Sequence, residues 1–473
     1  MRNLISLLAL LLLAGCAQNP VTGTQDFVMM SESQEVALGR QADVQVKKQY
    51  KVYESKALQD YVNRVGQRIA KQSHRPDLQY HFTVLDSAEI NAFALPGGYV
   101  YITRGILAYL NSEAELAAVL GHEIGHVTAR HGVRQQSAAQ AANLGLTIAS
   151  IFVPEVGSVG GQNLANIVGG ALLSGYGREH ELEADRLGAE YLARTAYDPQ
   201  AIIKVVRVLK DQELKDAELA KQEGREPRRY HGLFATHPDN DTRLQQAVSE
   251  ADKNGNAHAH FEGRDAFLAA TDGLLFGDSS DQGIVRDNHF YHADLGIGLA
   301  FPPTWQVHNQ PDSLIAVSPG GEAMMQLKLD QQPRGTPIDY ARRIIGTSSG
   351  VQPLQINGLS AATFELSNAM GGVIYLDKFA YVIQAQGKSR GTLTPLRNDI
   401  FNTVRSFHAL TLTERKQVRP LTIRVINARP GDTYARLAQS SPLGKSAEIY
   451  LRLFNAQYPE GEPRTGQAIK IVE

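Results

Sequence analysis

Residues 121–131 (GHEIGHVTARH) place two histidines, His122 and His126, four positions apart, with Glu123 directly after the first. On a helix these histidines lie about 40° apart around the axis and roughly 6 Å apart along it, so both imidazoles can reach one ion. Tetrahedral zinc binds histidine nitrogen at about 2.0–2.1 Å, and the adjacent glutamate can act as general base toward a water at the metal. The pattern predicts that His122 and His126 are zinc ligands and that Glu123 is catalytic.

The alternative interpretation is a surface helix with two solvent-facing histidines. The flanking residues argue against it, because Leu116, Leu120 and Ile124 are typical of a buried helix and buried polar side chains need partners. A third protein ligand is then expected from another helix, with a fourth position left open for water. Residues 178–185 (REHELEAD) offer Glu181, with His180 as a rival.

The HExxH motif, followed 55 residues after His126 by Glu-x-x-Ala-Asp, resembles the HtpX-type family of zinc metallopeptidases. The resemblance implies a mostly α zincin-type peptidase domain with a small β-sheet and one bound Zn²⁺. It also implies that Glu181 is the third ligand and that Asp185, one turn further on, orients a zinc-bound histidine. Glu179 and Glu183 are expected to be ordinary helix charges.

Two further segments are similar to that family. Residues 91–98 (NAFALPGG) match the segment before the active-site helix, where a strand edge could pair with an extended substrate. Residues 235–238 (ATHP), with Arg243 six positions after His237, match the final motif. The resemblance implies that His237 and Arg243 are catalytic and lie near the substrate carbonyl. Two other interpretations of His237 are an inhibitory fourth zinc ligand and a polar loop residue without a role.

The N-terminus predicts export and lipidation. Arg2 precedes an apolar run, Leu4 to Leu13, which is too short for a permanent membrane span but has the length of a signal-peptide core. Small residues before Cys16 resemble a lipobox, so we expect a signal peptide at 1–15 and a lipid anchor at Cys16. A buried structural cysteine is the alternative for this sole cysteine. The residue after the cysteine is Ala17, and in this the sequence resembles Gram-negative lipoproteins of the outer membrane.

The rest of the chain predicts several domains. We expect a tether and then the peptidase domain, followed by a linker, a mostly β (α+β) accessory domain with short alternating strands, and a small βααβ domain. These five parts are expected at 16–31, 32–262, 263–285, 286–408 and 420–473. Strands are expected at 80–85 and 99–103. Ser112, with Glu115 three residues later, predicts a capping box that begins a helix. Residues 143–175, apolar and glycine-rich, predict two buried helices. The alternatives are a mobile flap, or a segment that dips into membrane or apolar substrate beside the active site.

The last domain resembles a LysM module at Gly431-Asp432-Thr433, Asn455 and Gly466-Gln467. This resemblance implies a peptidoglycan partner, and a small packing domain is the alternative. A net charge of −2 without basic runs excludes a nucleic-acid partner. Together these patterns predict a zinc endopeptidase, lipid-anchored on the periplasmic side of the outer membrane, that degrades misfolded or misassembled envelope proteins. An envelope chaperone or assembly factor with secondary or locked proteolysis is the alternative.

Overall fold

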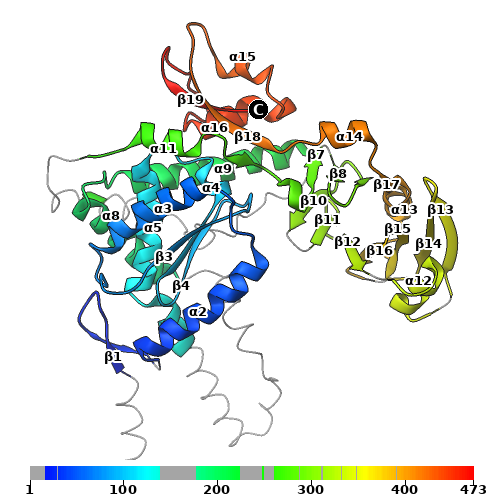
Figure 1. Cartoon of the computed structure of the whole chain (residues 1–473), viewed down its shortest axis with the longest axis horizontal. Coiled ribbons are helices and arrows are strands. Elements are labelled where there is room, and N and C mark those ends of the chain that lie inside the picture. Colours follow the sequence, from blue (N-terminus) through cyan, green and yellow to red (C-terminus); the bar gives the residue numbers. More distant parts are fainter. Residues whose placement is uncertain are drawn as a thin grey trace, which may run out of the picture. The chain divides into compact units, whose positions relative to one another are not determined.

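The computed structural model shows two compact units, and Figure 1 traces them in sequence colours. The first comprises the described parts of Met1–Leu214, Arg229–Leu274 and Ile423–Glu473, and the second those of Lys215–Arg228 and Leu275–Thr422. The structure describes residues 16–28, 30–138, 177–223, 248–249, 260–286, 288–310, 313–331, 333–347, 349–389 and 391–473. No helix in these ranges combines the length and the apolar character needed to cross a bilayer.

A three-stranded sheet lies at the centre of the N-terminal part of the first unit. Its strand order is β3-β5-β4, with β3 parallel and β4 antiparallel to β5, so that β4 is an edge strand. Alternation along β5 separates the two faces, because Tyr99 and Tyr101 contact α2 while Val100 and Ile102 are buried on the other side. The bounds are β3 His81–Leu85, β4 Ala92–Leu95, β5 Tyr99–Thr103 and α2 Glu32–Gln49.

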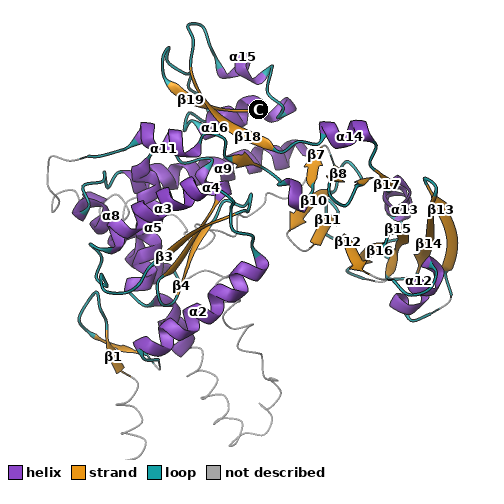
Figure 2. Cartoon of the chain, viewed as in Figure 1, coloured by secondary structure: helices purple, strands orange, loops and turns teal. Residues whose placement is uncertain are grey.

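The remaining helices of this part are purple in Figure 2. They are α3 Lys56–Ala70, α4 Arg104–Leu107, α5 Glu113–Thr128, α8 Arg178–Arg194, α9 Ala201–Glu223 and α11 Arg264–Thr271. Every residue of α5 is buried. Its N-cap is Ser112, whose side chain accepts a hydrogen bond from the Glu115 amide, as the sequence indicates. The Glu115 carboxylate accepts instead from the Asn111 amide, so the reciprocal half of the expected capping box is not formed.

Glycines allow α5 and α8 to approach closely. A Cβ atom added at Gly125 would lie 3.0 Å from the Ala184 carbonyl oxygen, and one at Gly188 would lie 3.1 Å from the His122 nitrogen. At Gly121 it would lie 3.5 Å from the Gly188 Cα. The helix that carries HExxH is therefore in backbone contact with the helix that carries Glu181.

Two segments differ from the expected organisation. Residues 16–28, expected in a tether, form a hairpin of β1 (Cys16–Gln18) and β2 (Gln25–Phe27), closed by Asn19, whose side chain accepts from two turn amides. Residues 263–285, expected as a linker, contain α11, which buries Phe267 and Leu268. The strands of the hairpin have three residues each and α11 has eight, too few for hydrophobic periodicity to identify them from the sequence.

The C-terminal segment has the element order strand, helix, helix, strand, with β18 antiparallel to β19. The bounds are β18 Leu421–Asn427, α15 Tyr434–Ala438, α16 Ala447–Phe454 and β19 Ala468–Val472. From Ile423 onward it belongs to the first unit rather than standing alone. Its resemblance to a LysM module stays a prediction.

The second unit contains a seven-stranded antiparallel sheet, β10-β11-β12-β16-β15-β14-β13, and a four-stranded sheet, β17-β9-β8-β7. Alternation along β16 places Tyr381 and Ile383 in one core and Ala380 and Val382 in another. Helix α13 (Arg397–Ser406) contributes to the first core and α12 (Pro337–Ile345) to the second. This agrees with the expectation of a mostly β region with one or two helices, although the unit extends beyond 286–408.

The strands and short helix of the second unit have these bounds: β6 Leu275–Phe276, β7 Ile284–Arg286, β8 His289–His292, β9 Ile297–Ala300, β10 Gln306–Gln310, β11 Ser313–Val317, β12 Ala323–Gln331, β13 Val351–Ile356, β14 Leu359–Glu365, β15 Ala369–Leu376, β16 Phe379–Gly387, β17 His408–Ala409 and α14 Leu412–Gln417.

Candidate metal centre and active site

Three buried side chains converge between α5 and α8. One ligand atom from each of His122, His126 and Glu181 lies within 4.8 Å of the other two. The Glu181 Oε2 is 3.4 Å from the Nε2 of each histidine, and the two Nε2 atoms are 3.0 Å apart. A tetrahedral ion with bonds of about 2.0–2.1 Å needs ligand separations of about 3.3 Å. The arrangement therefore fits a zinc ion bound by two nitrogens and one carboxylate oxygen.

Hydrogen bonds behind the cluster support this fit. The Nδ1 of His122 lies 2.9 Å from Asp185 Oδ1, and a carboxylate can only accept, so Nδ1 carries the proton. In neutral His122 the Nε2 lone pair then points toward the Nε2 of His126 and the carboxylate of Glu181. A lone pair and a carboxylate that face each other inside a protein need a positive charge between them.

The pKa shifts of the ion-free protein reflect the same environment. Burial lowers the pKa of His122, but its hydrogen bonds with Asp185 and Glu181 outweigh burial, and its pKa is raised well above the ordinary value. Burial lowers the pKa of His126 to about 3 against the opposing hydrogen bond with Glu181. Positive charge at His122 is thus favoured by the two carboxylates that contact it.

Glu123 lies beside the cluster, against the edge strand β4. Burial raises its pKa to about 7, and the negative charge of Glu181 adds to this effect. The positive charge of His122 and a hydrogen bond with the Ala94 backbone act in the opposite direction. A carboxyl group with this pKa can both take up and release a proton near neutral pH.

A second layer of side chains lies behind His126. The His126 Nδ1 is 2.8 Å from the Nδ1 of His131, and the His131 Nε2 is 3.0 Å from Glu183 Oε2. Arg134 donates to the same Glu183 oxygen at 3.1 Å. The hydrogen bond with His131 lowers the pKa of Glu183 to about 2, with Arg134 contributing, and outweighs partial burial. The expectation that Glu183 is an ordinary helix charge is therefore wrong.

His180 does not join the cluster of candidate ligands. Its ring stacks on His131 with centroids 4.3 Å apart, and among the described residues the group able to hold a metal contains Glu181 and not His180. The glutamate of the second motif thus lies where the resemblance places it, one residue beyond the rival histidine.

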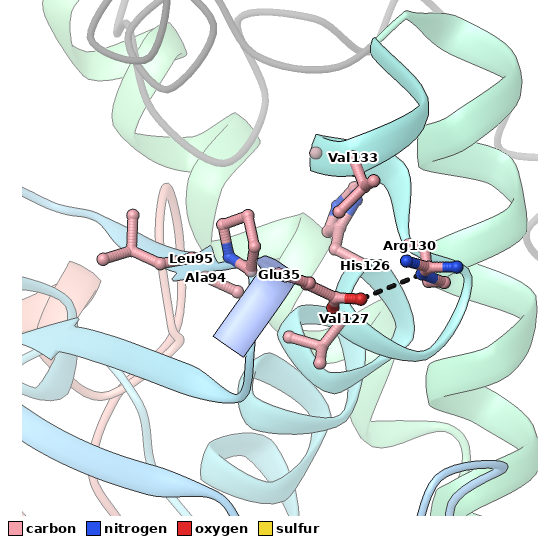
Figure 3. Close-up of a pocket in the computed structure, with 9 residues that line it drawn as sticks. Glu35, Ala94, Leu95, His126, Val127, Arg130 and Val133 are labelled. Atoms are coloured by element: carbon pink, nitrogen blue, oxygen red, sulfur yellow. Dashed lines mark hydrogen bonds and ion pairs between the residues drawn. The ribbon is translucent and has the colours of Figure 1, made fainter. Parts of the chain in front are cut away.

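A pocket adjoins His126 and is drawn in Figure 3. Its wall includes Ala94 and Leu95 of β4, Val127 and Val133, and the ion pair between Glu35 and Arg130. Its remaining lining residues are Pro96 and Gly132.

Glu35 is completely buried and accepts hydrogen bonds from Arg75 at 2.8 Å, from Arg130 at 2.9 Å and from the Gly97 amide at 3.3 Å. Arg75 also donates to the Val127 carbonyl. Glu35 thus joins α2 to the end of the HExxH helix and to the turn after β4. Sequence patterns do not identify this residue, because an acidic side chain in the first turn of a helix is also typical of the surface.

Several predicted residues lie outside the described structure. His237 and Arg243 fall within 224–247, and the apolar stretch 143–175 falls within 139–176, neither of which the structure describes. The backbone of Cys16 is described as the first residue of β1, but its side chain is not. Their roles stay predictions.

Comparison with known proteins assigns the domain. Residues 56–251 match the model of peptidase family M48. The β-barrel assembly-enhancing protease of Yersinia pestis is 30% identical over 243 residues, which cover 50% of this chain and 47% of that protein. The same protease of Escherichia coli K12 gives the same identity and coverage. The mitochondrial metalloendopeptidase OMA1 of Schizosaccharomyces pombe is 34% identical over 141 residues, 30% of this chain and 41% of that protein.

The matched region thus spans about half the length of the bacterial relatives. A solved structure, the PsbP of a Synechocystis cyanobacterium, matches 28% of this chain and 98% of that one with 11% identity and a TM-score of 0.21, too low to assign a fold. The family match covers the helices and strands that bring His122, His126 and Glu181 together. Residues 56–251 of this chain are therefore similar to the metallopeptidases of family M48, among them the β-barrel assembly-enhancing proteases.

Proposed function

We propose that the protein is a zinc-dependent endopeptidase. The observation that carries the proposal is the buried group of His122, His126 and Glu181, with Glu123 beside it. These three side chains would hold the ion, which when bound supplies Lewis acidity to a scissile carbonyl and to a water. Asp185 keeps the proton of His122 on Nδ1, so that Nε2 remains a ligand.

Glu123 is the general base of the proposed reaction. Its carboxylate accepts a proton from the attacking water and passes it to the leaving amine. Its burial beside His122 and its contact with the Ala94 backbone place this carboxylate next to the proposed ion. His237 and Arg243 are proposed to stabilise the oxyanion, or His237 to block the site until substrate arrives.

An extended polypeptide is the proposed form of the substrate. Among the described strands, β4 pairs only with β5, and a substrate strand can add to an open edge by main-chain hydrogen bonds. The contact between Glu123 and the Ala94 backbone would place the cleaved bond beside the base. Such recognition favours unfolded or misassembled chains over folded ones.

The decisive experiment compares Glu123→Gln with the parent chain in zinc content and in cleavage of an unfolded protein such as reduced casein. We expect unchanged zinc and a loss of cleavage of about 10²–10⁴-fold. Glu179→Gln is the matched control, because Glu179 is an exposed glutamate of α8. Cleavage at the parent rate by the zinc-loaded Glu123→Gln variant would overturn the proposal.

The proposed location is the periplasmic side of the bacterial outer membrane, with a lipid at Cys16. The apolar N-terminal run, the lipobox-like residues and the names of the bacterial relatives support an envelope protease acting on misfolded or misassembled envelope proteins. Cys16→Ser should release the folded protein from membranes, because acyl chains provide the anchor. Retention of the signal-cleaved variant on membranes at high salt would contradict this location. Peptidoglycan binding by 420–473 is a further proposal, tested by sedimentation with purified sacculi.

An envelope chaperone or assembly factor with locked proteolysis remains the second candidate. Cells that produce Glu123→Gln separate the two functions. A peptidase function predicts that this variant behaves like a deletion strain, whereas a chaperone function predicts that it behaves like the parent.

A further inference from the structure

His131 and Glu183 form a chain of hydrogen bonds behind one of the two candidate metal-binding histidines. The chain runs from His126 Nδ1 to His131 Nδ1 at 2.8 Å, and from His131 Nε2 to Glu183 Oε2 at 3.0 Å. Arg134 donates to Glu183 and also lies 3.5 Å from Asp26 of the N-terminal hairpin. His131 has no exposed surface. The chain is therefore shielded from solvent at its centre.

Only one placement of protons satisfies every group of this chain when both imidazoles are neutral. Two Nδ1 atoms 2.8 Å apart share one hydrogen, so one of them donates and the other accepts. If His131 donated, its Nε2 would present a lone pair to the Glu183 carboxylate, and two acceptors would oppose each other. If His126 donates, His131 carries its proton on Nε2 and donates to Glu183.

This placement has a consequence at the metal centre. A neutral His126 with its proton on Nδ1 presents the Nε2 lone pair toward His122 and Glu181. The opposite tautomer would place a proton where the ion must bind. Glu183 thus selects the tautomer of His126 from two hydrogen bonds away, through the intervening imidazole of His131.

We propose that His131 and Glu183 are positioning residues that prepare His126 for metal binding. The inference rests on the proposed function in so far as His126 is a zinc ligand. The two histidines of HExxH are then oriented by different hydrogen bonds. Asp185 contacts His122 directly, whereas Glu183 acts on His126 through His131. Hydrogen bonds from such partners contribute about 10–100-fold to metal affinity.

The test measures zinc affinity rather than hydrolysis. The full chain is stripped of metal and titrated with Zn²⁺ against a chromophoric chelator, for the parent and for His131→Leu and His131→Asn. The leucine removes the acceptor, whereas the asparagine Oδ1 can accept from His126 near the position of the lost Nδ1. We expect affinity to fall about 10–100-fold in His131→Leu and by a clearly smaller factor in His131→Asn, which restores an acceptor for His126 but not the link to Glu183.

Glu183→Gln tests the selection of the tautomer. Its amide can donate to His131 as well as accept from it, so it no longer excludes the wrong tautomer, and we expect about tenfold weaker zinc binding. Glu179→Gln, exposed on the same helix, should bind zinc as the parent does. The absorption spectrum of the Co²⁺-loaded variants reports whether the remaining ligands keep their geometry.

Two results would overturn the proposal. Parent-like zinc affinity in both His131→Leu and Glu183→Gln would show that the hydrogen bonds of His131 and Glu183 do not act on the metal centre. Equal losses in His131→Leu and His131→Asn, with equally lowered thermal unfolding temperatures, would assign His131 a packing role only. A failure of the proposed peptidase activity is separate, because it appears as cleavage by Glu123→Gln and leaves the zinc affinities unchanged.

Discussion

Four carboxylates lie in or next to the site: Glu181, Glu183 and Asp185 of α8, and Glu123 of α5. Their contacts differ. Glu181 faces the two Nε2 atoms, Asp185 and Glu183 each bind a histidine ring nitrogen, and Glu123 contacts the edge strand. Burial and hydrogen-bond partners give these carboxyl groups different pKa values, from about 2 at Glu183 to about 7 at Glu123. Such divergence within one site is typical of catalytic centres.

Zinc content should separate the ligands from the base. We expect His126→Ala combined with Glu181→Ala to abolish stoichiometric zinc, because only one protein ligand of the cluster then remains. The measurement is metal analysis of the purified chain after dialysis. Stoichiometric zinc in the double variant would contradict the ligand assignment.

His131 also predicts how acid affects the zinc-free protein. Burial lowers its pKa to about 4 in the folded state, against 6.5 when unfolded. Between these values the unfolded chain binds the extra proton, so the free energy of unfolding falls as pH falls, by at most about 1.4 kcal/mol per pH unit for this residue. Urea unfolding at pH 7, 6 and 5 should therefore show a shallower decline in His131→Asn than in the parent. Parallel declines would contradict the assigned shift.

His237 has two opposite roles that one variant can distinguish. Neutral imidazole is a good fourth ligand for a three-ligand zinc site, so a blocking His237 predicts that His237→Ala raises or deregulates cleavage of unfolded proteins. An oxyanion-stabilising His237 predicts a loss of about 10²–10³-fold. The cleavage rate is measured with zinc content as the control. A large loss with zinc retained would rule out the blocking role.

At the scale of elements, the contact between α5 and α8 determines the geometry of the site. The sequence predicted α5 from its cap and apolar flanks, and the strands near 80–85 and 99–103 from their β-branched and aromatic residues. It could not predict the Glu183 or Glu35 contacts, because those depend on which helix faces meet in three dimensions. His131 lies five residues after His126 in the same segment of the sequence, but helical spacing alone does not assign it a role.

Gly188→Val should weaken the metal site by separating these helices. A Cβ atom there would lie 3.1 Å from the His122 nitrogen and 3.4 Å from the Gly121 carbonyl carbon, and both contacts are backbone. We expect destabilisation of about 1–3 kcal/mol and weaker zinc binding, measured by chemical denaturation and chelator competition. Gly177→Ala is the control, since no atom of the described residues outside its chain neighbours lies within 4 Å of its added Cβ. Parent-like zinc affinity in Gly188→Val would show that the helix contact does not set the ligand geometry.

At the scale of the whole molecule, the C-terminal segment is a fixed part of the peptidase unit. Lys470 of β19 is completely buried, and its Nζ donates to the carbonyl oxygens of Ala108 at 2.6 Å and Leu110 at 2.7 Å, directly before the HExxH helix. Arg264 donates to both Asn111 and Ala468, and the ring of Phe454 lies 5.0 Å from that of Tyr109. Sequence patterns identified its elements but not these contacts, and those of Lys470 join positions about 360 residues apart.

Lys470→Met therefore tests whether this segment supports the active-site helix. Methionine keeps most of the apolar volume but leaves the Ala108 and Leu110 carbonyls without their donor, which costs about 1–3 kcal/mol for each unsatisfied group. The buried Glu115 also loses the positive charge that lowers its pKa, so its carboxylate becomes less favourable. We expect a lower free energy of unfolding and faster amide exchange at the start of α5. Lys445→Met, at an exposed lysine of the same segment, should change neither. Unchanged exchange in Lys470→Met would mean that the C-terminal segment folds beside the peptidase without stabilising the helix that carries its chemistry.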